Sequence, residues 1–307
     1  MATAADLLAV VAALVTQLAD AWLLLCVLSL GYWLAPRVAA DPRAVVATLV
    51  GLAFAALAVS LGLKSVFTVP RPAGAATATA PDFLAPPLTE LFRSVATSDG
   101  FGFPSGHATA AAAVYGGCAA FLDVGTRRDR WLVAGSVITA VAASRVVLGL
   151  HSVAQVVAGV ACGLTLLWLA ARVSRPGLRS RPDRLFFGVA LVGLAATLAT
   201  GLRGGGESVT VTAVAVGGSV GGYLVWRVRG RDDTPVGLGG ALAGLALAAV
   251  PLGYAGVVVT SGVPAVLGVL ADTVALRAVA ATSAAAVAVA FVLSWPALLG
   301  RTWQPEA

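Results

Sequence analysis

The amino-acid sequence predicts an all-α fold, a polytopic membrane helix bundle with about nine transmembrane helices. Composition carries the first part of this prediction. Hydrophobic residues make up 59% of the 307 residues and charged residues 11%, whereas soluble domains average about 45–50% and about 25%. The mean hydropathy is +0.93. Uncharged runs long enough to cross roughly 30 Å of hydrocarbon as a helix recur along the chain, and these runs predict the transmembrane helices.

The spans follow one another with short connections. The N-terminal stretch 4–36 is too long for one span and is interrupted by Gln17 and Asp20. We expect a short interfacial or re-entrant piece there, followed by a helix over about 18–36. Further spans are expected at 44–63, 106–123, 131–147, 152–171, 185–202, 208–226 and 278–300, of which the second and third are slightly short.

The uncharged run 234–271 decides the span count. One helix at about 236–258, followed by an outer loop, gives nine spans, with ten as the alternative. With the N-terminus outside and the C-terminus cytoplasmic, nine spans place most of the 20 basic residues in cytoplasmic loops, as the positive-inside tendency requires. The first residues carry an acid and no basic segment, so no cleaved signal peptide is expected. These observations favour a multi-pass protein of the cell membrane. Because the basic residues lie in such loops, the net charge of +6 predicts no nucleic-acid partner.

Five ionisable residues fall at the predicted outer surface: Lys64, Arg71, His107, Arg145 and His151. The two histidines are the only ones in the sequence. Taken alone, Lys64 at a helix end would be a snorkelling anchor. Ionisable residues at the membrane edge are nevertheless costly, and they are candidates for function by default.

Residues 103–107, FPSGH, open an apolar helix beside these cations. The free backbone N–H groups of a helix start bind anions, and Gly106 allows an anion to approach the backbone closely. Arginine and lysine together favour phosphate as that anion. The alternative for this pentapeptide alone is a helix N-cap by Ser105, with His107 facing lipid headgroups.

Three motifs combine these residues. "KSVFTVPRP" begins at Lys64, "PSGH" ends at His107, and "SRVVLGLH" ends at His151. In order and spacing they resemble the signature of the type-2 phosphatidic acid phosphatase superfamily, which includes vanadium haloperoxidases and glucose-6-phosphatase. The resemblance implies a six-helix-type phosphatase core. We expect that core over 1–172, with motifs at 64–72, 103–107 and 144–155, and a C-terminal four-helix membrane extension over 173–307.

The resemblance also implies a role for each motif residue. His151 would be the nucleophile that forms a phosphohistidine intermediate, and His107 would protonate the leaving oxygen. The phosphoryl oxygens would be held by Lys64, Arg71, Ser105, Gly106 and Arg145. No metal and no cofactor is needed where arginines and lysine supply the positive charge.

Gln155 departs from the common pattern, because most members of the superfamily carry Asp four residues after the nucleophilic histidine. At this spacing on a helix the two side chains can touch, so Gln155 would orient the nucleophile without adding a charge. Gln at this place is similar to the glucose-6-phosphatase and dolichyl-diphosphate phosphatase branch. An inactive relative is the alternative.

The loop 73–100 is the one sizeable segment outside the membrane near these motifs, and its second half predicts an amphipathic piece lying on the membrane. We expect an integral membrane phosphatase whose substrate partner is a lipid phosphate or polyprenyl diphosphate, surrounded by membrane lipids. The alternatives are a glucose-6-phosphatase-like sugar phosphatase, an inactive lipid-phosphate-binding relative and a transporter. Small residues in the C-terminal helices favour close packing, and a homodimer surface is a further option.

Overall fold

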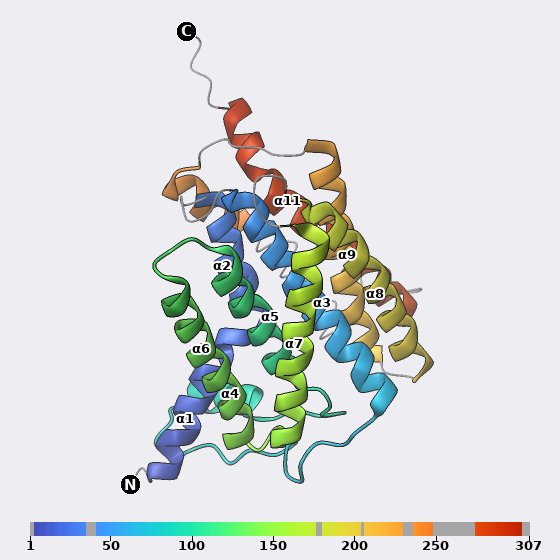
Figure 1. Ribbon diagram of the computed structural model, residues 1–307. Coiled ribbons are helices and arrows are strands. Elements are labelled where there is room, and N and C mark those ends of the chain that lie inside the picture. Colours follow the sequence, from blue (N-terminus) through green and yellow to red (C-terminus); the bar gives the residue numbers. More distant parts are fainter. Residues whose placement is uncertain are drawn as a thin grey trace.

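The computed structural model describes residues 3–34, 41–175, 180–203, 206–229, 236–247 and 274–302. Every regular element in these ranges is a helix. Figure 1 shows the helices packed side by side as one bundle, with the start of α1 (Ala4–Thr16) at one end and the end of α11 (Val274–Thr302) at the other. The fold is therefore the all-α polytopic bundle that the composition predicts.

Six described helices are long and apolar enough to cross a membrane, which makes the chain a multi-pass membrane protein. They are α3 (Pro42–Phe67), α6 (Arg127–Val147), α7 (Val153–Ser174), α8 (Pro182–Leu202), α9 (Gly206–Arg229) and α11. Of the other expected spans, 106–123 forms the shorter helix α5 (Gly106–Phe121), and 236–258 is described only as a helix over Leu238–Leu247. The rest of that last span lies outside the described residues, so the count of nine stays a prediction.

The N-terminal stretch forms a bent helix pair. Helix α1 begins with a capping box between Thr3 and Asp6 and ends in the 3-10 turn Gln17–Ala19. Asp20 has an extended backbone, and α2 (Ala21–Leu34) leaves this point at 50° to the first piece. The helix expected over 18–36 thus begins only at residue 21, because Asp20 interrupts the helical hydrogen bonds.

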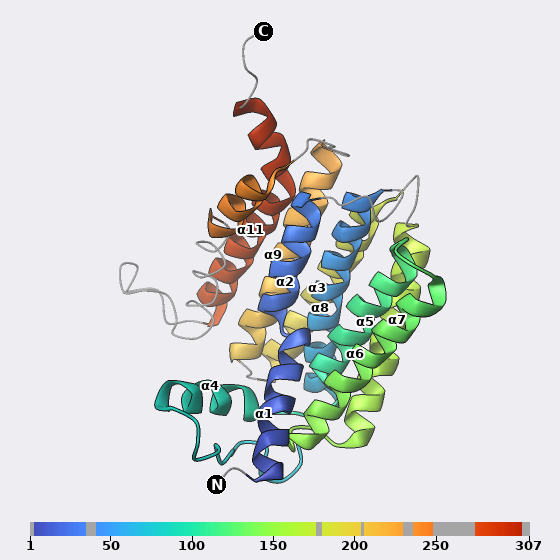
Figure 2. The same ribbon diagram turned by 90° about the vertical axis from the view of Figure 1, so that its left-hand side faces the viewer.

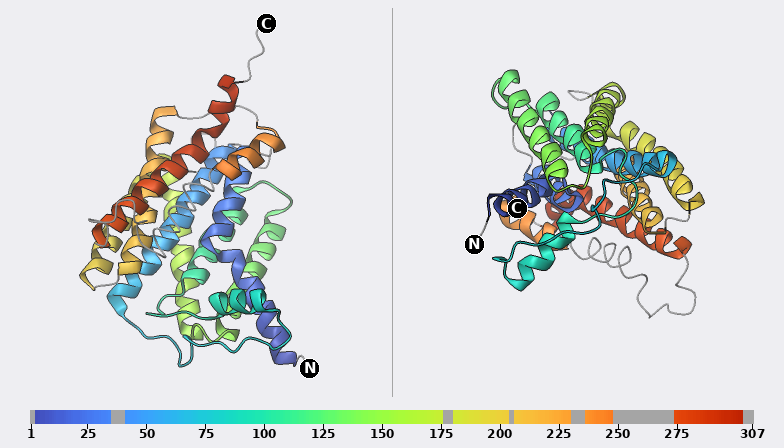
Figure 3. Two further views of the ribbon diagram at one scale, coloured as in Figure 1. Left: turned by 180° about the vertical axis from the view of Figure 1, so that it is seen from behind. Right: turned by 90° about the horizontal axis from the view of Figure 1, so that it is seen from below.

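Helix α3 is the centre of the hydrophobic core. Most of its residues are buried, and Leu49 and Leu52 pack in one cluster with Trp33 of α2 and Phe186 of α8. Helix α3 contacts α5 and α7 on one side and α8 and α9 on the other. Figure 3 shows the green helices α5 to α7 on one flank of the bundle and the yellow to red helices α8, α9 and α11 on the other. The C-terminal helices therefore pack directly on the helix that carries the first motif.

Helices α5 and α7 approach each other closely through two glycines. A Cβ atom at Gly159 would lie 2.6 Å from the carbonyl oxygen of Ser105, and one at Gly163 would collide with the carbonyl oxygen of Thr109. Four residues separate these glycines, so both lie on one face of α7. This contact brings the start of α7, where the third motif ends, against the start of α5, where the second lies.

The loop between the first two motifs contains α4 (Pro86–Ala96), which lies across the end of the bundle beside α1 (Figure 2). Phe92 and Ala96 are buried, whereas Leu88 and Leu91 are exposed. This helix confirms the amphipathic piece that the sequence predicts in the loop 73–100.

Candidate active site

The three motifs meet at the lower end of the bundle in Figure 1. Lys64 lies in the last turn of α3, and Arg71 follows in the loop. Ser105 precedes α5, and Arg145 lies in the last turn of α6. His151 lies in the short connection from α6 to α7. The chain reverses direction at each of these points, so residues from four segments converge on one small volume.

His151 is held by Gln155, one helical turn further along the chain. Gln155 Nε2 donates to the carbonyl oxygen of Pro70 at 2.9 Å, which turns its Oε1 toward the imidazole. Oε1 lies 3.1 Å from His151 Nδ1 and also accepts from the backbone N–H of Ser152. Because this oxygen can only accept, Nδ1 carries the proton and Nε2 keeps its lone pair. Nucleophilic attack requires that tautomer.

Arg71 faces that lone pair. Its Nη1 donates to the carbonyl oxygen of Leu150 and lies 3.0 Å from His151 Nε2, while its Nε donates to the carbonyl oxygen of Asp99. The backbone thus fixes the guanidinium directly beside the imidazole. An anion bound here would contact the imidazole and the guanidinium together.

The electrostatics of this arrangement keep His151 neutral. Burial and, after it, the positive charges of Arg71, Lys64 and Arg145 together lower the pKa of His151 to about 3. Burial also lowers the pKa of Arg71 from its usual value. At neutral pH the imidazole is therefore unprotonated and chemically available as a nucleophile.

Ser105 occupies the N-cap position of α5 but does not cap the helix with its side chain. Its hydroxyl is fully buried and has no hydrogen-bond partner among the described residues. Such an orphaned hydroxyl is costly unless a ligand completes it. At Gly106, a Cβ atom would lie 3.3 Å from Ser60 Oγ and 4.0 Å from Lys64 Nζ. The N-cap alternative for FPSGH is therefore wrong in its side-chain detail, and the geometry leaves donors for an anion.

Arg145 is 4% exposed, and its hydrogen-bond partner lies on the N-terminal helix α1. Its Nη1 donates to Thr16 Oγ1 at 3.0 Å, while its Nε has no partner among the described residues. Within the described part of the chain, no carboxylate forms an ion pair with Lys64, Arg71 or Arg145. Three cations around one point without a paired carboxylate favour the binding of a multiply charged anion.

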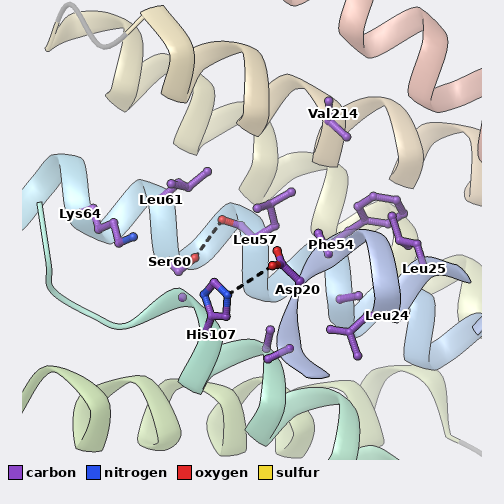
Figure 4. Close-up of a pocket in the computed structure, with 15 residues that line it drawn as sticks. Asp20, Leu24, Leu25, Phe54, Leu57, Ser60, Leu61, Lys64, His107 and Val214 are labelled. Carbon is purple, nitrogen blue, oxygen red and sulfur yellow. Dashed lines mark hydrogen bonds and ion pairs between the residues drawn. The ribbon is translucent and has the colours of Figure 1, made fainter. Parts of the chain in front are cut away.

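His107 faces a residue that sequence reasoning did not assign to the site. Its Nε2 lies 3.9 Å from Asp20 Oδ2, at the break between α1 and α2. Figure 4 shows the imidazole directed at that carboxylate. The charge that interrupts the apolar stretch 4–36 was visible in the sequence, but its spatial neighbour was not. Thr16 gave no sequence signal at all.

Two cavities meet at Lys64. The first, of about 230 Å³, is lined mainly by apolar side chains of α2, α3 and α5 and by Val214 of α9, and it opens onto His107 (Figure 4). The second, of about 540 Å³ and here called the polar cavity, is lined by several charged side chains, among them Arg71, Asp99 and, from the C-terminal half, Arg203. Arg203 is a second residue that the motifs did not identify.

The fold is that of a multi-pass helical membrane protein, and the three cations form a candidate anion site at one end of the bundle. The family model of the PAP2 superfamily matches residues 44–177, which include all three motifs. This segment is therefore similar to the PAP2 superfamily of phosphatases and haloperoxidase-like enzymes, and the similarity supports phosphoester hydrolysis as the general activity. Comparison with the curated proteins and with the solved structures found no match.

Proposed function

We propose that the protein hydrolyses a lipid phosphate, either a phosphomonoester or a polyprenyl diphosphate, through a phosphohistidine intermediate and without a metal ion. The observation that carries this proposal is the apolar cavity that ends at His107 and Lys64. A leaving group next to the proton donor would enter a space lined by leucine, alanine and phenylalanine side chains. Such a lining suits a hydrocarbon chain and offers little to a sugar.

The reaction follows from the positions of the donors. Lys64, Arg145 and Ser105 bind the phosphoryl oxygens, and Arg71 moves from the His151 lone pair onto them. His151 Nε2 attacks phosphorus as the bond to the leaving oxygen breaks, and His107 gives its proton to that oxygen. His107 then accepts a proton from the water that cleaves the phosphorus–nitrogen bond, which releases phosphate and restores both histidines.

Gln155 supports an active enzyme over an inactive relative. The amide already accepts the Nδ1 proton and fixes the tautomer that attack requires. It adds no negative charge, so the three cations and the substrate supply the electrostatic balance.

The orientation in the membrane is part of the proposal. We infer that the active site faces the extracytoplasmic side of the cell membrane, with the N-terminus outside and the C-terminus cytoplasmic. The positive-inside tendency supports this orientation. The start of α1 and the end of α11 also lie at opposite ends of the bundle (Figure 1).

The decisive experiment is phosphate release by the purified protein in lipid nanodiscs. Lipid monophosphates, polyprenyl diphosphates and glucose 6-phosphate are compared, each with and without vanadate and with and without a chelator. We expect lipid substrates to be hydrolysed in a vanadate-sensitive, chelator-insensitive manner. His151→Ala should abolish the activity, and mass spectrometry after rapid quenching should find phosphorylated His151 in the wild type.

Arg93→Gln is the matched control, because Arg93 is an exposed basic residue of α4 at the same end of the bundle. Its activity should equal that of the wild type. Preferential hydrolysis of glucose 6-phosphate would replace the lipid by a sugar phosphate. A requirement for metal, or full activity of His151→Ala, would contradict the mechanism.

A further inference from the structure

The bend between α1 and α2 supplies two polar residues to the candidate site. Thr16 Oγ1 accepts a hydrogen bond from Arg145, and the carboxylate of Asp20 faces His107. Both lie before residue 44, outside the segment that the PAP2 family model matches. The three motifs therefore do not complete the site by themselves.

His107 stands in a field of positive charge. The charged groups that act on it are Lys64 of α3, Arg145 of α6 and the carboxylate of Asp20. Burial and the two cations disfavour a protonated imidazole, yet a proton donor to the leaving oxygen must carry that proton. Asp20 is the one carboxylate among these groups, and it also lies in the field of Arg145.

A structural role at the start of α2 is the simpler account of Asp20. The backbone N–H of Leu24 donates to the Asp20 carbonyl oxygen, as expected at a helix start, where Asp is common. This account does not explain why the carboxylate lines the apolar cavity and faces the imidazole. A charge at such a place is costly in a membrane protein. Asparagine caps helices as well as aspartate does, so a substitution can separate the two roles.

We propose that Asp20 is the positioning residue of the proton donor: its carboxylate favours the protonated imidazole of His107 and orients it beside the leaving oxygen. This inference rests on the proposed function. Nε2 of His107 faces Asp20, which leaves the other ring nitrogen for the substrate. As the bond from His151 to phosphorus forms and the bond to the leaving oxygen breaks, the proton passes from His107 to that oxygen. His107 becomes neutral, and Asp20 stays ionised throughout.

The test compares two leaving groups in the full-length protein. An alkyl lipid phosphate needs a proton on its leaving oxygen, whereas p-nitrophenyl phosphate releases a stable phenolate without one. We expect Asp20→Asn to lower kcat on the lipid phosphate by about 10²-fold, since general acid catalysis contributes about 10²–10⁴-fold. On p-nitrophenyl phosphate kcat should fall far less. The alkaline limb of the lipid pH profile should move to lower pH, because the imidazolium loses its carboxylate.

Two further variants guard against a folding defect. Asp20→Glu should recover part of the lipid activity, and Asp82→Asn, an exposed aspartate in the loop 73–100, should behave as the wild type. Equal losses of Asp20→Asn on both substrates, or no loss on either, would overturn the role of Asp20. Wild-type protein that releases phosphate from neither substrate would instead overturn the proposed function.

Discussion

Gln155 shows how a single amide can take the place of a carboxylate. Its nitrogen donates to Pro70 in the first motif, and its oxygen accepts from His151 in the third. The residue therefore links two motifs and fixes the position of the His151 imidazole. A Cβ atom at Gly102 would lie 2.6 Å from the amide, so the neighbouring backbone also confines the side chain.

Gln155→Leu removes all three side-chain hydrogen bonds, to Pro70, His151 and Ser152, and leaves the imidazole free to turn or change tautomer. We expect kcat to fall by about 10²–10⁴-fold, by analogy with the loss of the tautomer-fixing group in serine-protease triads. KM should change little, because Gln155 does not contact the phosphate in the proposed complex. Steady-state kinetics on the lipid substrate measure this split.

Gln155→Glu is the matched variant. It keeps an acceptor of the same length for Nδ1 but loses the donor to Pro70. Its kcat should lie between those of the wild type and Gln155→Leu. A Leu variant as active as the Glu variant would contradict the orienting role.

At the scale of elements, the contact between α5 and α7 places the second motif against the third. Gly159 and Gly163 allow the backbones to approach, in the manner of the small-residue contacts of membrane helices. The separation of Ser105 and His151 depends on this distance, because Ser105 precedes one helix and His151 the other.

Gly163→Ala should therefore destabilise the protein and lower its activity. The added methyl group would collide with the carbonyl oxygen of Thr109 and lie 2.7 Å from the Cβ atom of Ala112. Such overpacking costs about 1–3 kcal/mol. Thermal unfolding in detergent, followed by phosphate release at a temperature where both proteins are folded, measures the two effects.

The control is Gly135→Ala in α6, where a Cβ atom meets no atom within 4 Å. Alanine also favours a helix over glycine by about 1 kcal/mol, so this variant should be as stable as the wild type or slightly more so. Equal unfolding temperatures for the two alanine variants would show that the α5–α7 contact tolerates a methyl group.

At the scale of the whole molecule, the C-terminal helices take part in the candidate site. Val214 of α9 closes the apolar cavity, and Arg203 at the end of α8 lines the polar one. Lys64 borders both cavities, so the anion site lies between an apolar and a polar space. We expect the lipid chain to occupy the first and water or released phosphate to pass through the second.

Val214→Trp tests this arrangement by filling the apolar cavity. The value of kcat/KM should fall more for a long-chain lipid phosphate than for a short-chain one. Only the long chain has to occupy the part of the cavity that the tryptophan side chain fills. Leu224→Trp is the control, since Leu224 lies on the same helix but is 53% exposed. Equal losses for both chain lengths would place the lipid elsewhere.

The sequence alone determined the class of the fold and the chemistry of the motifs. Apolarity and helix length are local properties, so the helical membrane bundle and the amphipathic α4 could be predicted from composition and spacing. The residue types of the three motifs likewise pointed to phosphate, and the family match over 44–177 agrees with that resemblance. The individual roles of His151, His107 and the cations stay predictions for the kinetics to test.

The tertiary structure decided which distant residues meet. Arg145 and Thr16 are 129 positions apart, Asp20 and His107 are 87 apart, and Lys64 and Arg203, which line the same cavity, are 139 apart. Such contacts depend on how the helices pack and where α1 and α2 bend, and no local pattern encodes that geometry. The sequence thus predicted which residues form the candidate site, whereas only the fold showed the carboxylate beside His107 and the apolar cavity next to it.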